Sequence, residues 1–248
     1  MTMTAHDLAI PAQTNGGLYQ HMHHAGAPAA DIRAVQAAYA HATQLFFGLY
    51  RGSGRPFICH LVGTASVVAQ IDGRRDMIVA GMFHALFEAA VFPDGRTVKS
   101  ENNRAMIEKT IGPEAFQLIR LYEQFEWSET SIASMADQSA APDDLARRLW
   151  ILRLANEADE MSHCSFALAQ KPGRAIPSRL KNCAAMARKI GREKLAATLE
   201  YFSDEFQRQI TWTKDLTLDH SSASFRLLPS VRNYLRTRRW PTHRLHVI

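Results

Sequence analysis

The stretch from Met77 to Phe92 constrains the fold of this chain more than any other part of the sequence. Among its sixteen residues only His84 and Glu88 have titratable side chains, and all the others are apolar, alanine or glycine. A helix that is apolar around its whole circumference has to be covered on all sides by other elements. The sequence therefore predicts a central, buried helix over about Arg75–Phe92.

Helical spacing in the rest of the chain predicts that this helix packs among other helices. Apolar residues recur at helical spacing from Ala30 to Arg51, and Pro56 suits the first position of a helix that runs to about Ile71. Further helices are expected at about 101–111, 113–126, 142–161, 177–191 and 192–214. No period-two alternation is long enough to predict a strand, so the expected fold class is all-α, a helical bundle.

Composition divides the chain into three parts. Residues 1–29 are rich in Ala, Gly, Pro, Gln and His without a sustained period, which predicts a flexible N-terminal arm. Residues 30–215 are expected to form the helical domain, and residues 216–248 a basic C-terminal extension. From Arg226 onward there are six arginines and no acidic residue, so the formal charge of +5 falls to −1 (5 − 6) for the rest of the chain.

The partners of the basic extension stay open at this point. A solvated arm or a contact with a second subunit, in a homo-oligomer, is favoured over a nucleic-acid partner because aromatic residues are sparse among the arginines. No apolar run is long enough for a membrane span, and the N-terminus has no signal-peptide pattern. Three widely spaced cysteines, Cys59, Cys164 and Cys183, form no CxxC pair and indicate reduced thiols, so a cytoplasmic protein is expected.

Two titratable side chains share the central apolar helix. Because His84 and Glu88 are four residues apart, a continuous helix would place them on one face and in contact. A buried carboxylate has to be paired, hydrogen-bonded or protonated. The pair is therefore either a structural His–Glu contact or a catalytic one.

Other polar residues are expected to join that pair. His60 is the one strongly polar side chain in the apolar segment Pro56–Val62, and two histidines on consecutive buried helices favour a shared pocket. On the helix at 142–161, Asn156 continues a leucine stripe, which turns it toward the core, and Asp159 follows near the expected pocket rim. For Asn156, an ordinary helix-to-helix hydrogen bond is the competing interpretation.

Three segments together resemble a known enzyme family. They are RGSGRPFICHL (51–61), AGMFHALFEA (80–89) and RLANE (153–157), in this order along the chain. They are similar to the entry turn, the His-Asp helix and the distal helix of the hydrolase domain of bifunctional alarmone (RelA/SpoT-type) enzymes, in the HD superfamily. The resemblance covers about residues 30–160 and implies an HD-domain-like helical bundle.

Departures from the family pattern lie at its metal ligands. His60 and His84 stand at the two histidine positions, whereas Ala85 replaces the aspartate of the His-Asp pair. Asn156 replaces the distal aspartate, and of the family's Glu-Asp pair only Glu88 remains. The chain is thus closer to uncharacterised HD-like families that lack the aspartate after the second histidine.

These losses bear directly on the chemistry. Hard divalent cations prefer oxygen ligands, so two neutral imidazoles cannot hold one alone. We therefore expect no bound metal, no cofactor and no ordinary alarmone hydrolysis. By the same resemblance Arg51 and Arg55 flank the pocket entrance, although a solvated turn is the alternative. A separate cluster at His21–His24 is either a polar patch or a transition-metal site.

Three functions compete on this sequence. The first is a small-molecule enzyme of lyase, isomerase, cyclase or hydrolase type that uses a metal-poor pocket for acid/base chemistry. The second is a catalytically silent nucleotide-binding or regulatory module, and the third is a metal-dependent phosphohydrolase with rearranged ligands. For the first function, the expected catalytic residues are His84, Glu88 and His60, and the expected ligand-binding residues are Arg51, Arg55, Asn156 and Asp159.

Overall fold

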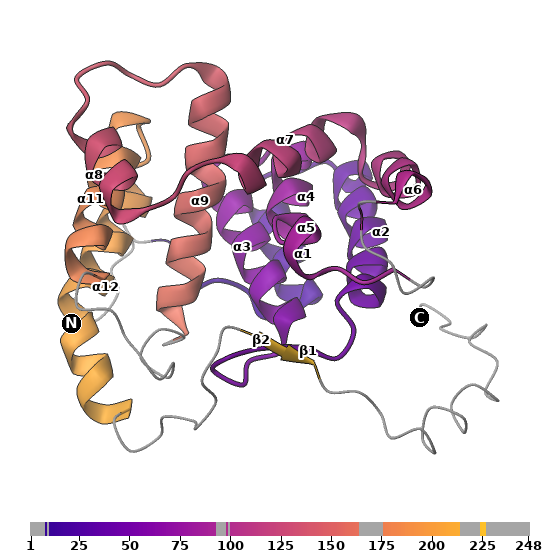
Figure 1. Ribbon diagram of the computed structural model, residues 1–248, viewed down its shortest axis with the longest axis horizontal. Coiled ribbons are helices and arrows are strands. Elements are labelled where there is room, and N and C mark those ends of the chain that lie inside the picture. Colours follow the sequence, from indigo (N-terminus) through magenta and orange to yellow (C-terminus); the bar gives the residue numbers. More distant parts are fainter. Residues whose placement is uncertain are drawn as a thin grey trace.

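The computed structural model describes residues 8, 10–92, 98, 100–163, 176–213 and 224–226, and in it helices pack directly on helices (Figure 1). The predicted all-α class is confirmed. The helices are α1 (Asn15–His24), α2 (Ala29–Leu45), α3 (Phe57–Ile71), α4 (Arg75–Phe83), α5 (Leu86–Ala89), α6 (Glu101–Ile111), α7 (Pro113–Gln124), α8 (Glu129–Asp137), α9 (Asp144–Ser162), α11 (Ile176–Lys189) and α12 (Glu193–Thr213).

One small ribbon of two strands accompanies the helices in the described part of the chain. Strand β1 (Leu49–Arg51) pairs antiparallel with β2 (Ser224–Arg226), with Tyr50 opposite Phe225. The expected helix through Arg51 therefore ends early, at Leu45. Gly48 has a φ of 68°, a left-handed conformation that stops a helix, and the chain beyond it is extended. Apart from Arg226 itself, the arginines of the tail lie outside the described residues.

Helix α9 lies between two groups of helices. It contacts α3, α4 and α7 on one side and α11 and α12 on the other, and Figure 1 shows it standing between these groups. Between Leu149 and Met161 every side chain is buried except those of Arg153 and Asn156, which are half-buried. The helix is therefore central to the fold, although its sequence contains several charged residues.

The predicted apolar helix is buried as expected but is shorter. All seven residues from Met77 to Phe83 are buried against neighbouring helices. The helix stops at Phe83, Ala85 has φ −94° and ψ 17°, and Leu86 begins the separate helix α5. The cause is local, because the His84 imidazole donates to the Gly81 carbonyl, 2.7 Å away, which in a continuous helix would accept from the amide of Ala85.

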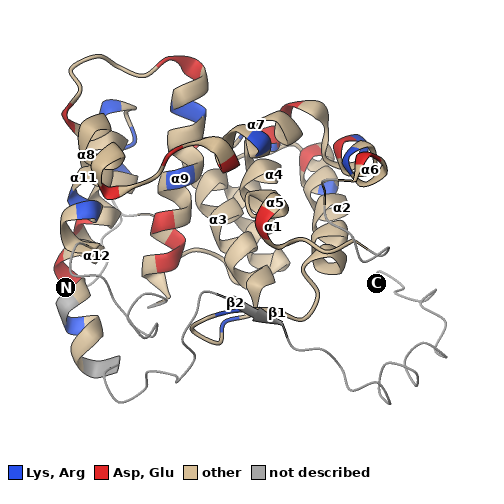
Figure 2. Cartoon of the chain, viewed as in Figure 1, with Lys and Arg blue, Asp and Glu red and all other residues tan. Residues whose placement is uncertain are grey.

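Close helix packing surrounds α3, which contains no Lys, Arg, Asp or Glu (Figure 2). At Gly81 of α4, a Cβ atom would meet Val68 Cγ2 at 3.2 Å and Ala65 Cα at 3.3 Å. At Gly63 of α3, a Cβ atom would lie only 1.7 Å from Asp159 Oδ1 on α9. Glycine at these two positions allows α4 and α9 to pack closely against α3.

The described part of the N-terminal segment differs from the expected flexible arm. Helix α1 is capped by the Thr14 side chain, and its Leu18 and Met22 are buried against the core. Ahead of α1, the Ala12 amide donates to Ser66 Oγ on α3 at 2.8 Å. The two apolar residues, four apart on one helix face, gain enough burial to attach this segment to the domain.

None of the described helices is both long enough and apolar enough to cross a bilayer.

The packing at Gly63 generates a first prediction. Gly63→Ala forces a methyl group against Asp159 and should lower the free energy of unfolding by about 1–3 kcal/mol or more through overpacking. Denaturant unfolding followed by circular dichroism measures the effect. Gly16→Ala is the control, because no atom lies within 4 Å of its added Cβ, and it should leave stability unchanged or slightly raised. Equal stabilities of the two variants would contradict the close α3–α9 contact.

Candidate functional site

The two histidines that the sequence singled out meet in the core. His60 in the first turn of α3 and His84 directly after α4 have their Nε2 atoms 3.1 Å apart. Their ring planes are nearly perpendicular, at 85°, with centroids 5.0 Å apart. Only 1% of His60 and 7% of His84 is exposed. The predicted convergence of these imidazoles is thus present in the structure.

Asp159 completes this arrangement from α9. Its Oδ2 lies 2.7 Å from His60 Nδ1, and the residue is fully buried. Both carboxylate oxygens also accept hydrogen bonds of 2.8 Å from the guanidinium of Arg55. The sequence placed Asp159 near the rim of a pocket, whereas the structure places it in the interior, between Arg55 and His60.

A second buried carboxylate, Glu160, was not anticipated from the sequence. Its Oε1 lies 3.3 Å from His60 Nδ1 and forms an ion pair with Arg51. The solvated-turn alternative for Arg51 and Arg55 is therefore wrong, because both pair with acidic residues of α9. Their predicted role in ligand binding stays a prediction. Figure 2 shows this group of acidic residues in α9. The signal in the sequence was the pair of acids at 159 and 160 within an otherwise buried helix.

Glu88 does not take part in the site. The predicted His84–Glu88 contact is wrong, because the helix breaks at His84 and Ala85 and the two residues no longer share a helix face. Glu88 is exposed in α5, where water solvates its charge without the cost of burial. The carboxylate partner of the histidine pair is Asp159, from a helix remote in sequence.

Asn156 is also peripheral to the histidine pair. It is half-buried, and its side chain makes no hydrogen bond to another residue in the part of the chain that the structure describes. One turn of helix separates it from Glu160, whose side chain is directed at Arg51 and His60. Asp159 and Glu160, rather than Asn156, provide the polar contacts from α9 to this site.

Hydrogen bonding determines where the protons of the two imidazoles lie. A carbonyl oxygen can only accept, so His84 Nδ1 donates to Gly81. His60 Nδ1 likewise donates to the Asp159 carboxylate. When both rings are neutral, each Nε2 therefore holds a lone pair, and the two lone pairs face each other across 3.1 Å. One additional proton could therefore bind between the two Nε2 atoms and form a hydrogen bond between the rings.

Burial controls the titration of this group. It lowers the pKa of His60 and of His84 to about 3, so that both are neutral at neutral pH. Burial raises the pKa of Asp159, and the hydrogen bonds and charge of Arg55 oppose this effect. Tyr122, whose ring meets the edge of His84 at a centroid distance of 5.4 Å, has its pKa raised to about 12 by burial. It is a neutral hydroxyl at neutral pH.

The donor set does not form a metal site within the described residues. The family resemblance implies a divalent cation held by two histidines and two aspartates. Here the Nε2 atoms of His60 and His84 converge, but Asp159 contacts the opposite nitrogen of His60. No group of three or more His, Cys, Asp or Glu side chains in this part of the chain could hold a metal ion. This statement also covers the His21–His24 cluster at the end of α1.

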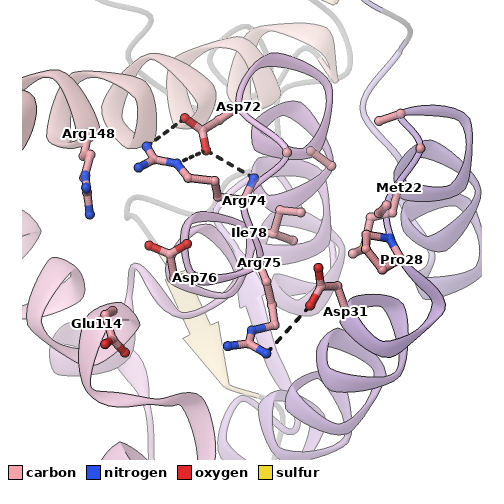
Figure 3. A pocket seen from close by; sticks show the side chains of 15 residues that line it. Met22, Pro28, Asp31, Asp72, Arg74, Arg75, Asp76, Ile78, Glu114 and Arg148 are labelled. Atoms are coloured by element: carbon pink, nitrogen blue, oxygen red, sulfur yellow. Dashed lines mark hydrogen bonds and ion pairs between the residues drawn. The ribbon is translucent and has the colours of Figure 1, made fainter.

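A separate cleft of about 800 Å³ opens between the α1–α2 and α3–α4 turns. Figure 3 shows that some of its charged groups pair with one another, Asp72 with Arg74 and Asp31 with Arg75. None of the histidine-site residues lines it. The buried site and this surface cleft are therefore distinct parts of the molecule.

Comparison with known families gives a match over part of the chain. Residues 49–126 match the model of a family described as a domain of unknown function (DUF6817). The comparison with curated proteins finds no match. The matched region runs from β1 through α7 and includes Arg51, Arg55, His60 and His84, whereas Asp159 and Glu160 lie beyond it.

The lowered histidine pKa values generate a second prediction. Because each folded-state pKa lies below its unfolded value of 6.5, the unfolded chain binds more protons between about pH 3 and 6.5. The contribution of these two buried, neutral histidines to the free energy of unfolding is therefore fully present above pH 6.5 and is lost as the pH falls toward 3. His84→Gln should reduce the dependence of unfolding free energy on pH between 4 and 7. His41→Gln, at an exposed position of α2, should keep the wild-type slope. Identical slopes for all three proteins would contradict neutral burial.

Proposed function

We propose that this chain is an enzyme that moves a proton on a small-molecule substrate, using a remodelled, metal-poor HD-like pocket. One observation supports the proposal above all others. The Nε2 atoms of His60 and His84 face each other at 3.1 Å while both Nδ1 atoms are already engaged as donors. Such a pair lacks one proton, and it can accept that proton only at the two facing nitrogens.

In this proposal His60, His84 and Asp159 form a proton relay, and their contacts suggest a role for each residue. Asp159 holds His60 in the tautomer that leaves Nε2 free, and it would offset the positive charge of a protonated His60 ring. Burial lowers the pKa of both imidazoles, so neither ring would hold an added proton tightly. A proton taken from the substrate at one Nε2 would thus be available for return to the substrate, and elimination, isomerisation, cyclisation and hydrolysis all need such transfers.

Two arginines set the charge of the surroundings. Arg55 pairs with Asp159 and Arg51 with Glu160, so each buried carboxylate near His60 has a cationic partner. Buried charges are costly unless they are paired in this way. In this proposal the catalytic residues are His60 and His84, with Asp159 orienting His60; Glu88 has no role.

A reducing compartment fits the thiols of the described residues. Cys59 and Cys183 are both free, and Cys183 is buried in α11. We propose a cytoplasmic enzyme with a small-molecule substrate as its partner. The HD-superfamily relationship is part of the same proposal and is supported by the meeting of the two histidines.

A metal-dependent phosphohydrolase is the second candidate. The observation in its favour is that two imidazole nitrogens converge while their opposite nitrogens are held by Asp159 and a backbone carbonyl, an arrangement often seen behind metal-binding histidines. Its weakness is the missing third ligand among the described residues.

The catalytic roles generate a third prediction. A thermal-shift screen of small metabolites would identify ligands, and hits would be assayed for turnover. Asp159→Asn should lower turnover by about 10²–10⁴-fold, the usual contribution of acid–base catalysis. Glu88→Gln makes the same chemical change at an exposed site and should retain wild-type turnover. The reverse ranking of these variants at matched folded fraction would refute the proposed relay. His84→Gln tests the relay independently if Asp159→Asn is poorly folded.

Metal content separates the two candidate functions and is the fourth prediction. Purified protein should contain well below one equivalent of divalent metal, because two imidazoles alone bind such ions weakly. Elemental analysis before and after dialysis against a chelator measures this. One equivalent of metal that resists the chelator and is lost in His60→Gln would replace the proton-relay proposal with the phosphohydrolase.

A further inference from the structure

We infer that Gln13, in the segment before α1, is a positioning residue for the histidine pair and acts through Arg55 and Asp159. The inference rests on the proposed function and deepens it, because it assigns part of the relay's geometry to a residue outside the helices that hold the histidines. Nothing in the sequence around Gln13 pointed to this role, since the segment has no helical period and no titratable partner.

The guanidinium of Arg55 is held on three sides. Its Nε donates to Gln13 Oε1 at 2.7 Å, and its two terminal nitrogens donate to the two oxygens of Asp159 at 2.8 Å each. One terminal nitrogen also donates to the Cys59 carbonyl at 2.9 Å. Of the five N–H groups of an arginine, four are therefore engaged. With 10% of its side chain exposed, Arg55 has almost no solvent to replace a lost partner.

Gln13 is itself fixed in place. Its side-chain amide nitrogen donates to the carbonyls of Ala12 at 3.1 Å and of Pro11 at 3.3 Å. The Ala12 amide donates to Ser66 Oγ, which donates in turn to the Gly63 carbonyl at 2.9 Å. The segment is thus attached to the turn of α3 that faces Asp159. Gln13 is a rigid acceptor, held at a defined position relative to both α3 and α9.

A single chain of contacts therefore leads from Gln13 to the histidine pair. Gln13 fixes the rotation of the Arg55 guanidinium, and the planar guanidinium fixes both oxygens of Asp159. Asp159 Oδ2 then accepts from His60 Nδ1 and directs Nε2 at His84. Loss of the first contact frees Arg55 to rotate, and the angle at which Asp159 meets His60 is no longer fixed.

Nuclear magnetic resonance of ¹⁵N-histidine-labelled protein tests this inference without a substrate. In wild-type protein the His60 Nδ1 proton should give a low-field resonance, because it is donated to a buried carboxylate. Gln13→Leu removes the acceptor for Arg55, and it should shift this resonance upfield and accelerate its exchange with water.

The matched control is the neighbouring residue. Thr14→Ala removes the N-cap of α1 and weakens the same segment without touching Arg55, so it should leave the His60 resonance unchanged. If Gln13→Leu does not fold, Gln13→Asn, which withdraws the amide by one methylene group, takes its place with the same expected shift.

The outcomes separate this inference from the proposed function. A folded Gln13→Leu or Gln13→Asn variant with an unchanged His60 resonance overturns the positioning role and leaves the relay intact. An equal shift in Thr14→Ala would reduce Gln13 to a general structural contact and likewise overturn it. Absence of the low-field His60 signal in wild-type protein would instead remove the Asp159–His60 contact on which the proposed function depends.

Discussion

The buried contact between Asp159, Arg55 and His60 is the interaction on which the rest of this structure depends. A carboxylate with no solvent exposure, in the middle of the central helix α9, would be strongly destabilising if it were unpaired. Both of its oxygens accept from Arg55, and one also accepts from His60. These bonds attach α9 to the start of α3 and determine which side of α3 faces it. Removing any one of these three side chains would leave an unpaired charge or an unsatisfied lone pair in the core.

Glycine makes that contact sterically feasible. Gly63 lies where α3 approaches Asp159, and a Cβ atom there would occupy the space of the carboxylate oxygen. Gly81 has two roles, because its missing side chain lets α4 approach α3 and its carbonyl accepts from His84. The hydrogen bond to the Gly81 carbonyl fixes the His84 tautomer and lies at the point where α4 ends. The geometry of the histidine pair thus depends on two residues that have no side chain.

The site is composite along the chain. The region that matches a family of unknown function supplies the two arginines and the two histidines, and the facing carboxylates come from α9. Gln13 adds a contact from the segment ahead of α1. The turn between Arg51 and Arg55, which directs both guanidinium groups at α9, continues from β1, and β1 pairs with β2 from the C-terminal part of the chain. Segments from both ends of the chain therefore support one buried group.

The sequence by itself determined the helical class, most helix bounds and the burial of Met77–Phe83, since these follow from apolar periodicity and from Gly and Pro at the breaks. It also identified His60 and His84, because polar residues are rare in those two apolar segments, and Asp159, because it follows the leucine stripe and Asn156 on one helix. Only the tertiary structure decided their partners. The chain ends α4 at His84, which moves Glu88 to solvent, and the nearest carboxylate then comes from α9, 99 positions after His60. Spacing along one helix predicts contacts within that helix, whereas contacts between helices depend on how closely they approach, which here is set by Gly63, Gly81 and the pairing of buried charge.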